Sequence, residues 1–387
     1  MQIKTQDELN ALCQRARQAG CFGLDSEFIP ENSYYPELAL IQIAVDEQCY
    51  IIDPLSALDL SPLENIICAE EVIVVVHAGA QDMGIFYHRT RKPPKNVFDT
   101  QIAASFIGMG HQVSYASLVQ QLFGIPLKKG QSYTNWLKRP LKPEQLQYAL
   151  EDVEYLLPAY EKMIATLEAA NRLSWVADEL THYEDADFYT AHEAHPEKRI
   201  KKTGQMHGRD QAVLEALAAF REDEAKSRNL PRKKILSDYT LVDLARRRPT
   251  SPGELLSLRS ADHLTKRYAK DLIRIITESN ASPLPERPRQ SYGSLTDNQT
   301  LVVEFLSFCL KAFCLKEQLA SVMLSTRAEL EYLVTDYFGD DFSEHRHRLL
   351  RGWRKDAVGN SILQCLKGEL TARYNPDKQQ LVFSVVE

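Results

Sequence analysis

The chain has 387 residues, of which 44% are hydrophobic and 26% charged, and its net charge is −7 at pH 7. This length predicts two or three domains, and apolar runs such as residues 72–76 are far shorter than the roughly 18 residues of a membrane span. The seven cysteines form no CxxC pair, and the first residues do not resemble a secretory leader. We therefore expect a cytoplasmic protein with no membrane partner, no zinc site and no disulfide framework.

The charge is divided unevenly along the chain. Residues 1–190 carry 14 basic and 26 acidic side chains, whereas residues 191–387 carry 32 and 27. A basic half that follows an acidic half is typical of nucleic-acid contact on the basic side, although an uneven but uninvolved surface gives the same composition.

The first 170 residues predict a mixed α/β domain. Short apolar runs bounded by turn residues predict three antiparallel strands, at 21–29, 38–45 and 49–52, and a β-branched run predicts a buried strand at 72–77. Apolar spacing predicts helices at 5–19, 80–90, 100–108, 114–123 and 143–169. This order predicts a mixed sheet with helices packed on it.

The rest of the chain has only helical patterns, interrupted by two polar stretches. These stretches predict linkers at 181–206 and 281–294, the second rich in proline. The predicted organisation is an α/β domain at 1–180 and two small all-α domains at 207–280 and 295–387. Helices are expected at 209–228, 240–247, 252–258, 262–277 and through 297–372.

Asp25 and Glu27 form the most distinctive local pattern. Side chains alternate along a strand, so both carboxylates point to one face, where two like charges are destabilising unless a positive group lies between them. Taken alone, however, the DxE pattern also fits a solvated strand face.

Two further patterns supply carboxylates. Asp82 falls in the first turn of a predicted helix after the buried strand, where the helix dipole favours a carboxylate. A helix-capping role alone would also explain an acid at this position. Tyr148 and Asp152 are four residues apart and lie on one face of another predicted helix, a spacing that also fits a packed tyrosine beside a surface acid.

Together the four carboxylates predict a metal site. Asp25, Glu27, Asp82 and Asp152 would bring about four negative charges into a small volume if they converged, and such charge requires cations. Carboxylate oxygens suit Mg²⁺ or Mn²⁺, and two such ions about 3.5–4 Å apart support phosphoryl transfer.

The motifs resemble those of ribonuclease D, in the DEDD superfamily of 3′→5′ exonucleases. They are LDSEF (24–28), HAGAQDMGIF (77–86) and YALEDVEYLLP (148–158), and the YxxxD spacing is that of the tyrosine subclass. SDYTLVDLARRRPTSPGELLSL (237–258) resembles an HRDC domain, a helical nucleic-acid-binding module, and LRGWRKDAVGNSIL (350–363) resembles the divergent second HRDC domain of the same chains. The resemblance implies an RNase H-like exonuclease domain followed by two HRDC-type domains.

The resemblance also implies roles for individual residues. Asp25, Glu27 and Asp152 would hold one metal ion, Asp25 and Asp82 would support a second, and Tyr148, with an ordinary pKa of roughly 10, would orient the attacking water. The substrate would be RNA with a free 3′ end, tRNA precursors in particular, shortened by one nucleoside 5′-monophosphate at a time. No dinucleotide cofactor is expected.

Phosphate contacts are expected mainly from basic side chains, because an acidic catalytic domain repels RNA. Two alternatives to this function remain at this stage: a DNA exonuclease of the same chemistry, and a non-catalytic RNA-binding protein on a nuclease scaffold. The candidate RNA contacts are Lys128, Lys129, Lys138, Arg232, Lys233 and Lys234.

Overall fold

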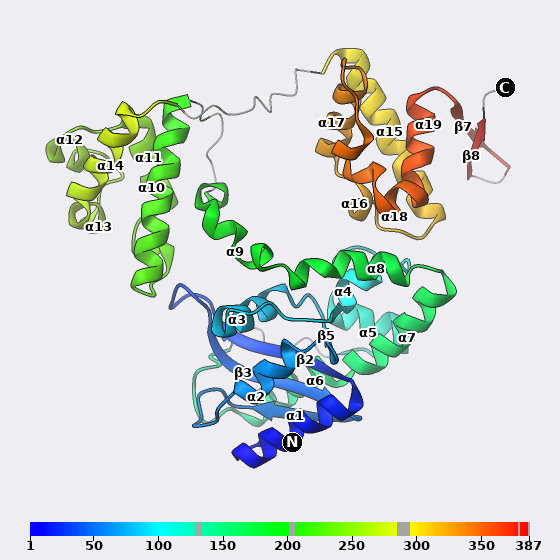
Figure 1. Ribbon diagram of the computed structural model, residues 1–387, viewed down its shortest axis with the longest axis horizontal. Coiled ribbons are helices and arrows are strands. Elements are labelled where there is room, and N and C mark those ends of the chain that lie inside the picture. The colour runs from blue at the N-terminus through cyan, green and yellow to red at the C-terminus, as the bar shows by residue number, and fades with distance from the viewer. Residues whose placement is uncertain (128–133, 201–205, 207, 285–294, 378–379, 386–387) are drawn as a thin grey trace.

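The computed structural model describes residues 1–387 except 128–133, 201–205, 207, 285–294, 378–379 and 386–387. Figure 1 shows an N-terminal α/β domain, a middle helical domain built around α10, and a C-terminal helical domain built around α15. A helical connector that contains α8 and α9 runs over the N-terminal domain between the two helical domains (Figure 1).

A six-stranded mixed sheet forms the N-terminal domain, in the order β1-β4-β3-β2-β5-β6. The antiparallel meander β2-β3-β4 is confirmed, and β5 and β6 extend the sheet in parallel with β2. The strands are β1 Gln2–Ile3, β2 Cys21–Ile29, β3 Glu37–Val45, β4 Gln48–Ile52, β5 Ile73–Val76 and β6 Val97–Asp99.

Helices cover both faces of this sheet. The apolar side chains of α1 share one core cluster with Ile41 and Ile43 of β3, whereas Ala149 of α6 packs against Leu40 on the other face. The helices are α1 Gln6–Ala19, α2 Ser61–Ile67, α3 Ala80–Thr90, α4 Thr100–Ala104, α5 Tyr115–Phe123, α6 Pro143–Glu154 and α7 Leu156–Ala169.

The single helix expected at 143–169 is divided at Tyr155. The backbone N–H of Tyr155 donates to the Tyr115 hydroxyl at 2.9 Å. Pro158, three residues later, has no N–H for a continuing helical ladder, so the chain restarts as α7.

The stretch expected to be a linker at 181–206 differs from that prediction. After α8 (Leu173–Leu180) come a 3-10 turn at Thr181–Glu184, α9 (Ala186–Ala194) and a second turn at Pro196–Arg199. Tyr183 and Tyr189 are buried in the core of the N-terminal domain, which therefore extends beyond residue 180. The polar composition of this stretch concealed its two buried tyrosines.

The middle domain is helical, as expected. It packs α10, α11 and α14 around Val213, Leu217, Leu244 and Leu272. Its helices are α10 Gly208–Ser227, α11 Asp238–Arg247, α12 Pro252–Leu256, α13 His263–Arg267 and α14 Ala269–Ala281.

The C-terminal domain is mainly helical and ends in an antiparallel hairpin that the sequence analysis did not predict. The hairpin side chains are partly exposed, so the sequence has no strongly apolar run there. The signal that could have predicted the strands is the alternation of less and more exposed positions along them. The elements are α15 Asp297–Lys316, α16 Ser321–Leu324, α17 Arg327–Tyr337, α18 Gly352–Arg354, α19 Asn360–Leu366, β7 Leu370–Asn375 and β8 Gln380–Val385.

Within the described residues, α15 alone is long and apolar enough to cross a membrane by length and composition. The sequence analysis expected no such segment. Val303, Leu306 and Leu310 of α15 are buried in the core of the C-terminal domain, whereas Leu301 and Leu315 are exposed.

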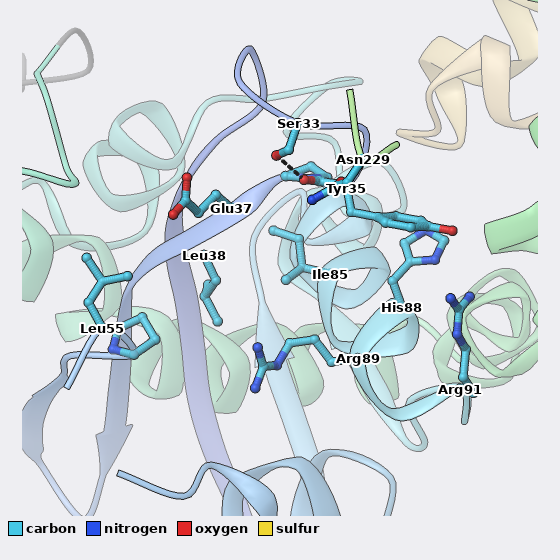
Figure 2. A pocket seen from close by; sticks show the side chains of 12 residues that line it. Ser33, Tyr35, Glu37, Leu38, Leu55, Ile85, His88, Arg89, Arg91 and Asn229 are labelled. Carbon is cyan, nitrogen blue, oxygen red and sulfur yellow. Dashed lines mark hydrogen bonds between the residues drawn. The ribbon is translucent and has the colours of Figure 1, made fainter. Parts of the chain in front are cut away.

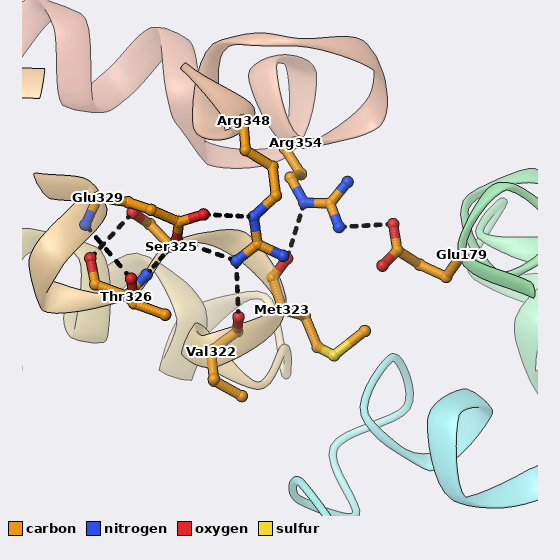
Figure 3. A network of polar contacts seen from close by, with 8 residues as sticks. All are labelled: Glu179, Val322, Met323, Ser325, Thr326, Glu329, Arg348 and Arg354. Atoms are coloured by element: carbon orange, nitrogen blue, oxygen red, sulfur yellow. Dashed lines mark hydrogen bonds and ion pairs between the residues drawn. The ribbon is translucent and has the colours of Figure 1, made fainter. Parts of the chain in front are cut away.

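Two junctions hold the helical domains against the N-terminal domain. Tyr34, in the loop after β2, donates a hydrogen bond to Glu222 of α10, and the Arg232 guanidinium lies 4.5 Å from the centre of the Tyr34 ring. At the other junction Arg354 of the C-terminal domain pairs with Glu179 of α8 at 2.6 Å (Figure 3), and Trp353 stacks on Trp175.

Candidate active site

Strand β2 places Asp25 and Glu27 on the α6 face of the sheet. Asp25 pairs with Gln42 of β3 and Glu27 with Leu40, and directly paired residues of antiparallel strands share a face. Because Leu40 packs against Ala149 of α6, both carboxylates face that helix. The strand is irregular between Glu27 and Phe28, where the register with β3 shifts.

A tight turn between β5 and α3 places Asp82. Strand β5 is parallel to β2, with Val75 paired to Gly23, so α3 begins beside the two β2 acids. Ala78 has a left-handed φ of 55°, and a Cβ on Gly79 would lie 2.5 Å from Val76. Asp82 is then 7% exposed in the first turn of α3, and the Ser26 hydroxyl donates to its carboxylate.

Asp99 fixes the geometry of that turn. Its carboxylate accepts the backbone N–H groups of Ala78 and Gly79, each at 3.0 Å, and the Tyr183 hydroxyl at 2.6 Å. The sequence analysis missed both Asp99 and Tyr183. Asp99 is the N-cap of α4, and an aspartate before a predicted helix is a sequence signal for such a cap. Its hydrogen bond with Tyr183 has no sequence signal, because the two residues are far apart in the chain.

Helix α6 presents Tyr148 and Asp152 toward β2. Its start is set by Pro143 in the first turn and by the Gln145 side chain, which accepts the Lys142 backbone N–H at 3.0 Å. The Tyr148 hydroxyl donates to the Asp152 carboxylate, as the four-residue spacing allows. Trp136 lies 6.2 Å from the Tyr148 ring, centre to centre, and helps to fix its position.

The four carboxyl groups perturb one another. Burial, and then repulsion from Asp82, Asp152 and Glu27, holds the pKa of Asp25 well above its usual range. Burial raises the pKa of Glu27 to about 8, that of Asp152 to about 7 and that of Asp82 to about 6. The structure therefore brings together the carboxylates that the sequence analysis singled out, in a region that favours added positive charge.

The donor set fits hard divalent cations. Gln42, fully buried and paired across the sheet with Asp25, has no hydrogen-bond partner for its amide nitrogen or oxygen among the described residues. A buried amide requires polar partners, and the water ligands of an ion held by Asp25 would supply them. Within the described ranges no group of three or more His, Cys, Asp or Glu side chains is placed to hold a metal ion.

Comparison with known proteins identifies the family. Residues 1–168 match the model of a 3′–5′ exonuclease family and residues 210–276 match the HRDC domain. The chain is 33% identical to ribonuclease D of Zymomonas mobilis over 98% of this chain and 96% of that one, and 32% identical to ribonuclease D of Nitrobacter hamburgensis over 95% of each. The chain belongs to the ribonuclease D family.

A solved structure agrees with this assignment over almost the whole chain. The crystal structure of Escherichia coli RNase D, described as an exoribonuclease involved in structured RNA processing, has a TM-score of 0.80 and 28% identity, and the match covers 95% of this chain and 98% of that one. As a member of the ribonuclease D family the chain is a hydrolytic 3′→5′ exoribonuclease, and exonucleases of this family generally use divalent metal ions.

His77, the first residue of the second ribonuclease D motif, has a structural position. Its Nε2 lies 3.0 Å from the Val113 carbonyl oxygen and its Nδ1 lies 2.9 Å from the Thr100 hydroxyl, while burial lowers its pKa. The His77 ring, through its contacts with Thr100 and Val113, holds the turn before Asp82.

The candidate RNA contacts are placed apart from one another. Lys233 and Lys234 are exposed on the middle domain, and Lys138 is exposed in the segment before α6. Arg232 instead forms an ion pair with the buried Glu222 at the junction with Tyr34. Lys128 and Lys129 lie outside the described residues.

Proposed function

We propose that this protein shortens RNA from the 3′ end by hydrolysis, releasing one nucleoside 5′-monophosphate at a time, with the 3′ trailers of tRNA precursors among its substrates. The observation that carries the proposal is the meeting of four carboxyl groups from β2, α3 and α6, each with a raised pKa. Two divalent ions, when bound there, supply the positive charge that stabilises the attacking and departing oxygens.

The side chains of the site have separate roles in the proposed reaction. Asp25, Glu27 and Asp152 would hold one ion, and Asp25 with Asp82 would hold the second; all are hard oxygen donors. The Tyr148 hydroxyl, beside Asp152, orients the attacking water with a hydrogen bond. Trp136 and Phe28 lie with Glu27 along a hollow of about 690 Å³, a volume that accommodates the terminal nucleoside.

Single-turnover assays test this function. A 5′-labelled tRNA precursor with a short 3′ trailer is incubated with Mg²⁺ or Mn²⁺ beside a DNA of matched sequence, and released mononucleotides are identified by chromatography. We expect a ladder that shortens one nucleotide at a time on RNA, slower cleavage of DNA, and no products with Asp25→Asn. Endonucleolytic fragments, or equal cleavage of DNA, would contradict the proposal.

A further inference from the structure

Two adjoining hollows lie along α3, close to the catalytic carboxylates. The inner part, of about 510 Å³, begins at Phe28 and Gln81, next to Glu27 and Asp82. The outer part, of about 550 Å³ (Figure 2), continues to Arg91. The two parts share Tyr35, Pro36, Ile85 and His88, so they are neighbours, and we call them together the α3 groove.

Three parts of the chain build the walls of the α3 groove. Gln81, Ile85 and His88 follow one another at four and three residues, so they form a stripe on one face of α3. Opposite this stripe lies the loop after β2, which carries Tyr35. Arg199 of the connector and Arg232 of the HRDC domain line the inner part, and Asn229 of the HRDC domain lines the outer part.

The middle of the groove combines an aromatic face with a cation. Figure 2 shows the Tyr35 ring beside the His88 ring, and their centres are 4.5 Å apart. The Arg91 guanidinium lies 5.7 Å from the centre of the Tyr35 ring. A hydrogen bond with Tyr35 raises the pKa of Arg91, so its charge is held at this place.

Arg91 is also available to a ligand. It is exposed, it hydrogen-bonds with the Tyr35 side chain, and Glu193 is near enough to contribute to its raised pKa. Arg89, in the same groove, pairs with Glu64 at 2.7 Å, and Arg232 pairs with Glu222 at 2.5 Å. Aromatic rings that stack on bases beside a cation that meets a phosphate are the combination that single-stranded RNA requires.

The two hollows that meet at Phe28 have opposite charge character. The described lining of the hollow at Trp136 includes the acids Glu27 and Glu31 and no basic side chain. The α3 groove is lined by four arginines and His88 against two acids, Glu37 and Glu193, so its described lining has an excess of positive charge. A nucleoside can occupy an acidic pocket, whereas successive phosphates favour the basic path.

We propose that the α3 groove binds the RNA chain upstream of the scissile phosphodiester, with a base stacked on Tyr35 and a phosphate at Arg91. This inference rests on the proposed function, because it supplies that active site with the preceding nucleotides of its substrate. In this proposal the junction with the HRDC domain forms one wall of the substrate path. Tyr35 and Arg91, which are not catalytic carboxylates, make the affinity for RNA depend on the length of the RNA.

Equilibrium binding tests the groove without requiring hydrolysis. Fluorescein-labelled single-stranded RNAs of two, five and ten nucleotides are titrated with the full chain carrying Asp25→Asn, alone and combined with Arg91→Ala, Tyr35→Ala or Tyr35→Phe. We expect Arg91→Ala and Tyr35→Ala each to weaken binding of the ten-nucleotide RNA about tenfold, with a much smaller loss for the dinucleotide. Tyr35→Phe retains the ring and should restore most of the affinity lost in Tyr35→Ala.

Salt dependence provides a second readout. Removing one phosphate contact to a single strand should reduce the slope of log affinity against log salt concentration by about 0.7, and we expect this for Arg91→Ala. Arg17→Ala is the matched control, because Arg17 is an exposed arginine of the same domain that pairs with Glu71 on α1's side of the sheet, outside the groove. It should change neither the affinity nor the slope.

The outcomes separate this inference from the proposed function. An unchanged affinity and salt slope in Arg91→Ala, or an equal loss for two and ten nucleotides, would overturn the groove even if the wild-type chain degrades RNA. If RNA binding shows the expected length and salt effects while the wild-type chain releases no mononucleotides, the groove stands and the proposed function fails.

Discussion

Replacing Asp25 by asparagine should stabilise the fold while it abolishes hydrolysis. Burial and repulsion raise the pKa values of the clustered carboxyl groups, so the folded chain holds protons that the unfolded chain releases. In a metal-free buffer the free energy of unfolding therefore falls as pH rises from the ordinary pKa of these acids through their raised values. Removing one of the negative charges relieves that loss.

The structure sets the magnitude of this effect. The pKa of Glu27 rises from 4.5 to about 8, which corresponds to at most about 5 kcal/mol of folding free energy withdrawn across that interval. Asp25 carries a penalty of the same kind, from its own burial and from repulsion by Asp82, Asp152 and Glu27. After a discount for solvent screening we expect Asp25→Asn to return about 1–2 kcal/mol at pH 8. For a domain of this size the gain corresponds to about 2–8 °C in Tm.

Differential scanning calorimetry in EDTA at pH 5.5 and pH 8 measures the effect. The difference in Tm between Asp25→Asn and the wild-type chain should be small at pH 5.5, where the folded site holds protons, and larger at pH 8. Mg²⁺ should raise the Tm of the wild-type chain more than that of the variant. Asp178→Asn, an exposed acid on α8, is the control and should show no such difference. A lower Tm for Asp25→Asn at pH 8, or an advantage independent of pH, would refute the electrostatic reasoning.

Three other predictions address separate parts of the molecule. Tyr148→Phe should lower kcat on RNA about 100-fold with KM within about twofold, because the ring remains and only the water-orienting hydroxyl is lost; steady-state kinetics that show a raised KM instead would argue against that role. Replacing Lys233 and Lys234 by alanine should weaken RNA binding and flatten its salt dependence in fluorescence titrations, and an unchanged slope would remove these lysines from the interface. Trp353→Ala should cost about 3–5 kcal/mol and loosen the C-terminal domain, because this buried ring packs on Trp175; the check is limited proteolysis with calorimetry, and a wild-type cleavage pattern would contradict the junction.

Local patterns determined the individual elements of the catalytic domain. The strand that carries Asp25 and Glu27 was predicted with the bounds that the structure has, Cys21–Ile29, because alternation and turn residues are both contained within a short window. The helix that carries Asp82 was predicted at 80–90 for the same reason, and α3 spans Ala80–Thr90. The spacing of Tyr148 and Asp152 fixed their shared face before any neighbour was known.

Three other features were not predicted from the sequence, for different reasons. The division of the helix at Tyr155 depends on a hydroxyl forty residues earlier, and the folded connector depends on Tyr183, which reaches Asp99 across the domain. The hairpin β7–β8 has an alternating pattern that was taken for the end of a helical domain. In the first two cases long-range contacts outweighed the composition of the segment, whereas the hairpin is a local element whose side chains are partly exposed.

The sequence by itself determined which side chains can do chemistry here and on which elements they lie, because residue type and periodicity are properties of neighbouring positions. Only the tertiary structure decided that these side chains meet. The parallel pairing of β5 with β2 brings α3 to Asp25, and the packing of α6 on β3 brings Asp152 to the same face. The α3 groove likewise exists only in the folded chain, because Tyr35, Arg91 and Asn229 come from three segments that meet through pairing and packing over long separations in sequence.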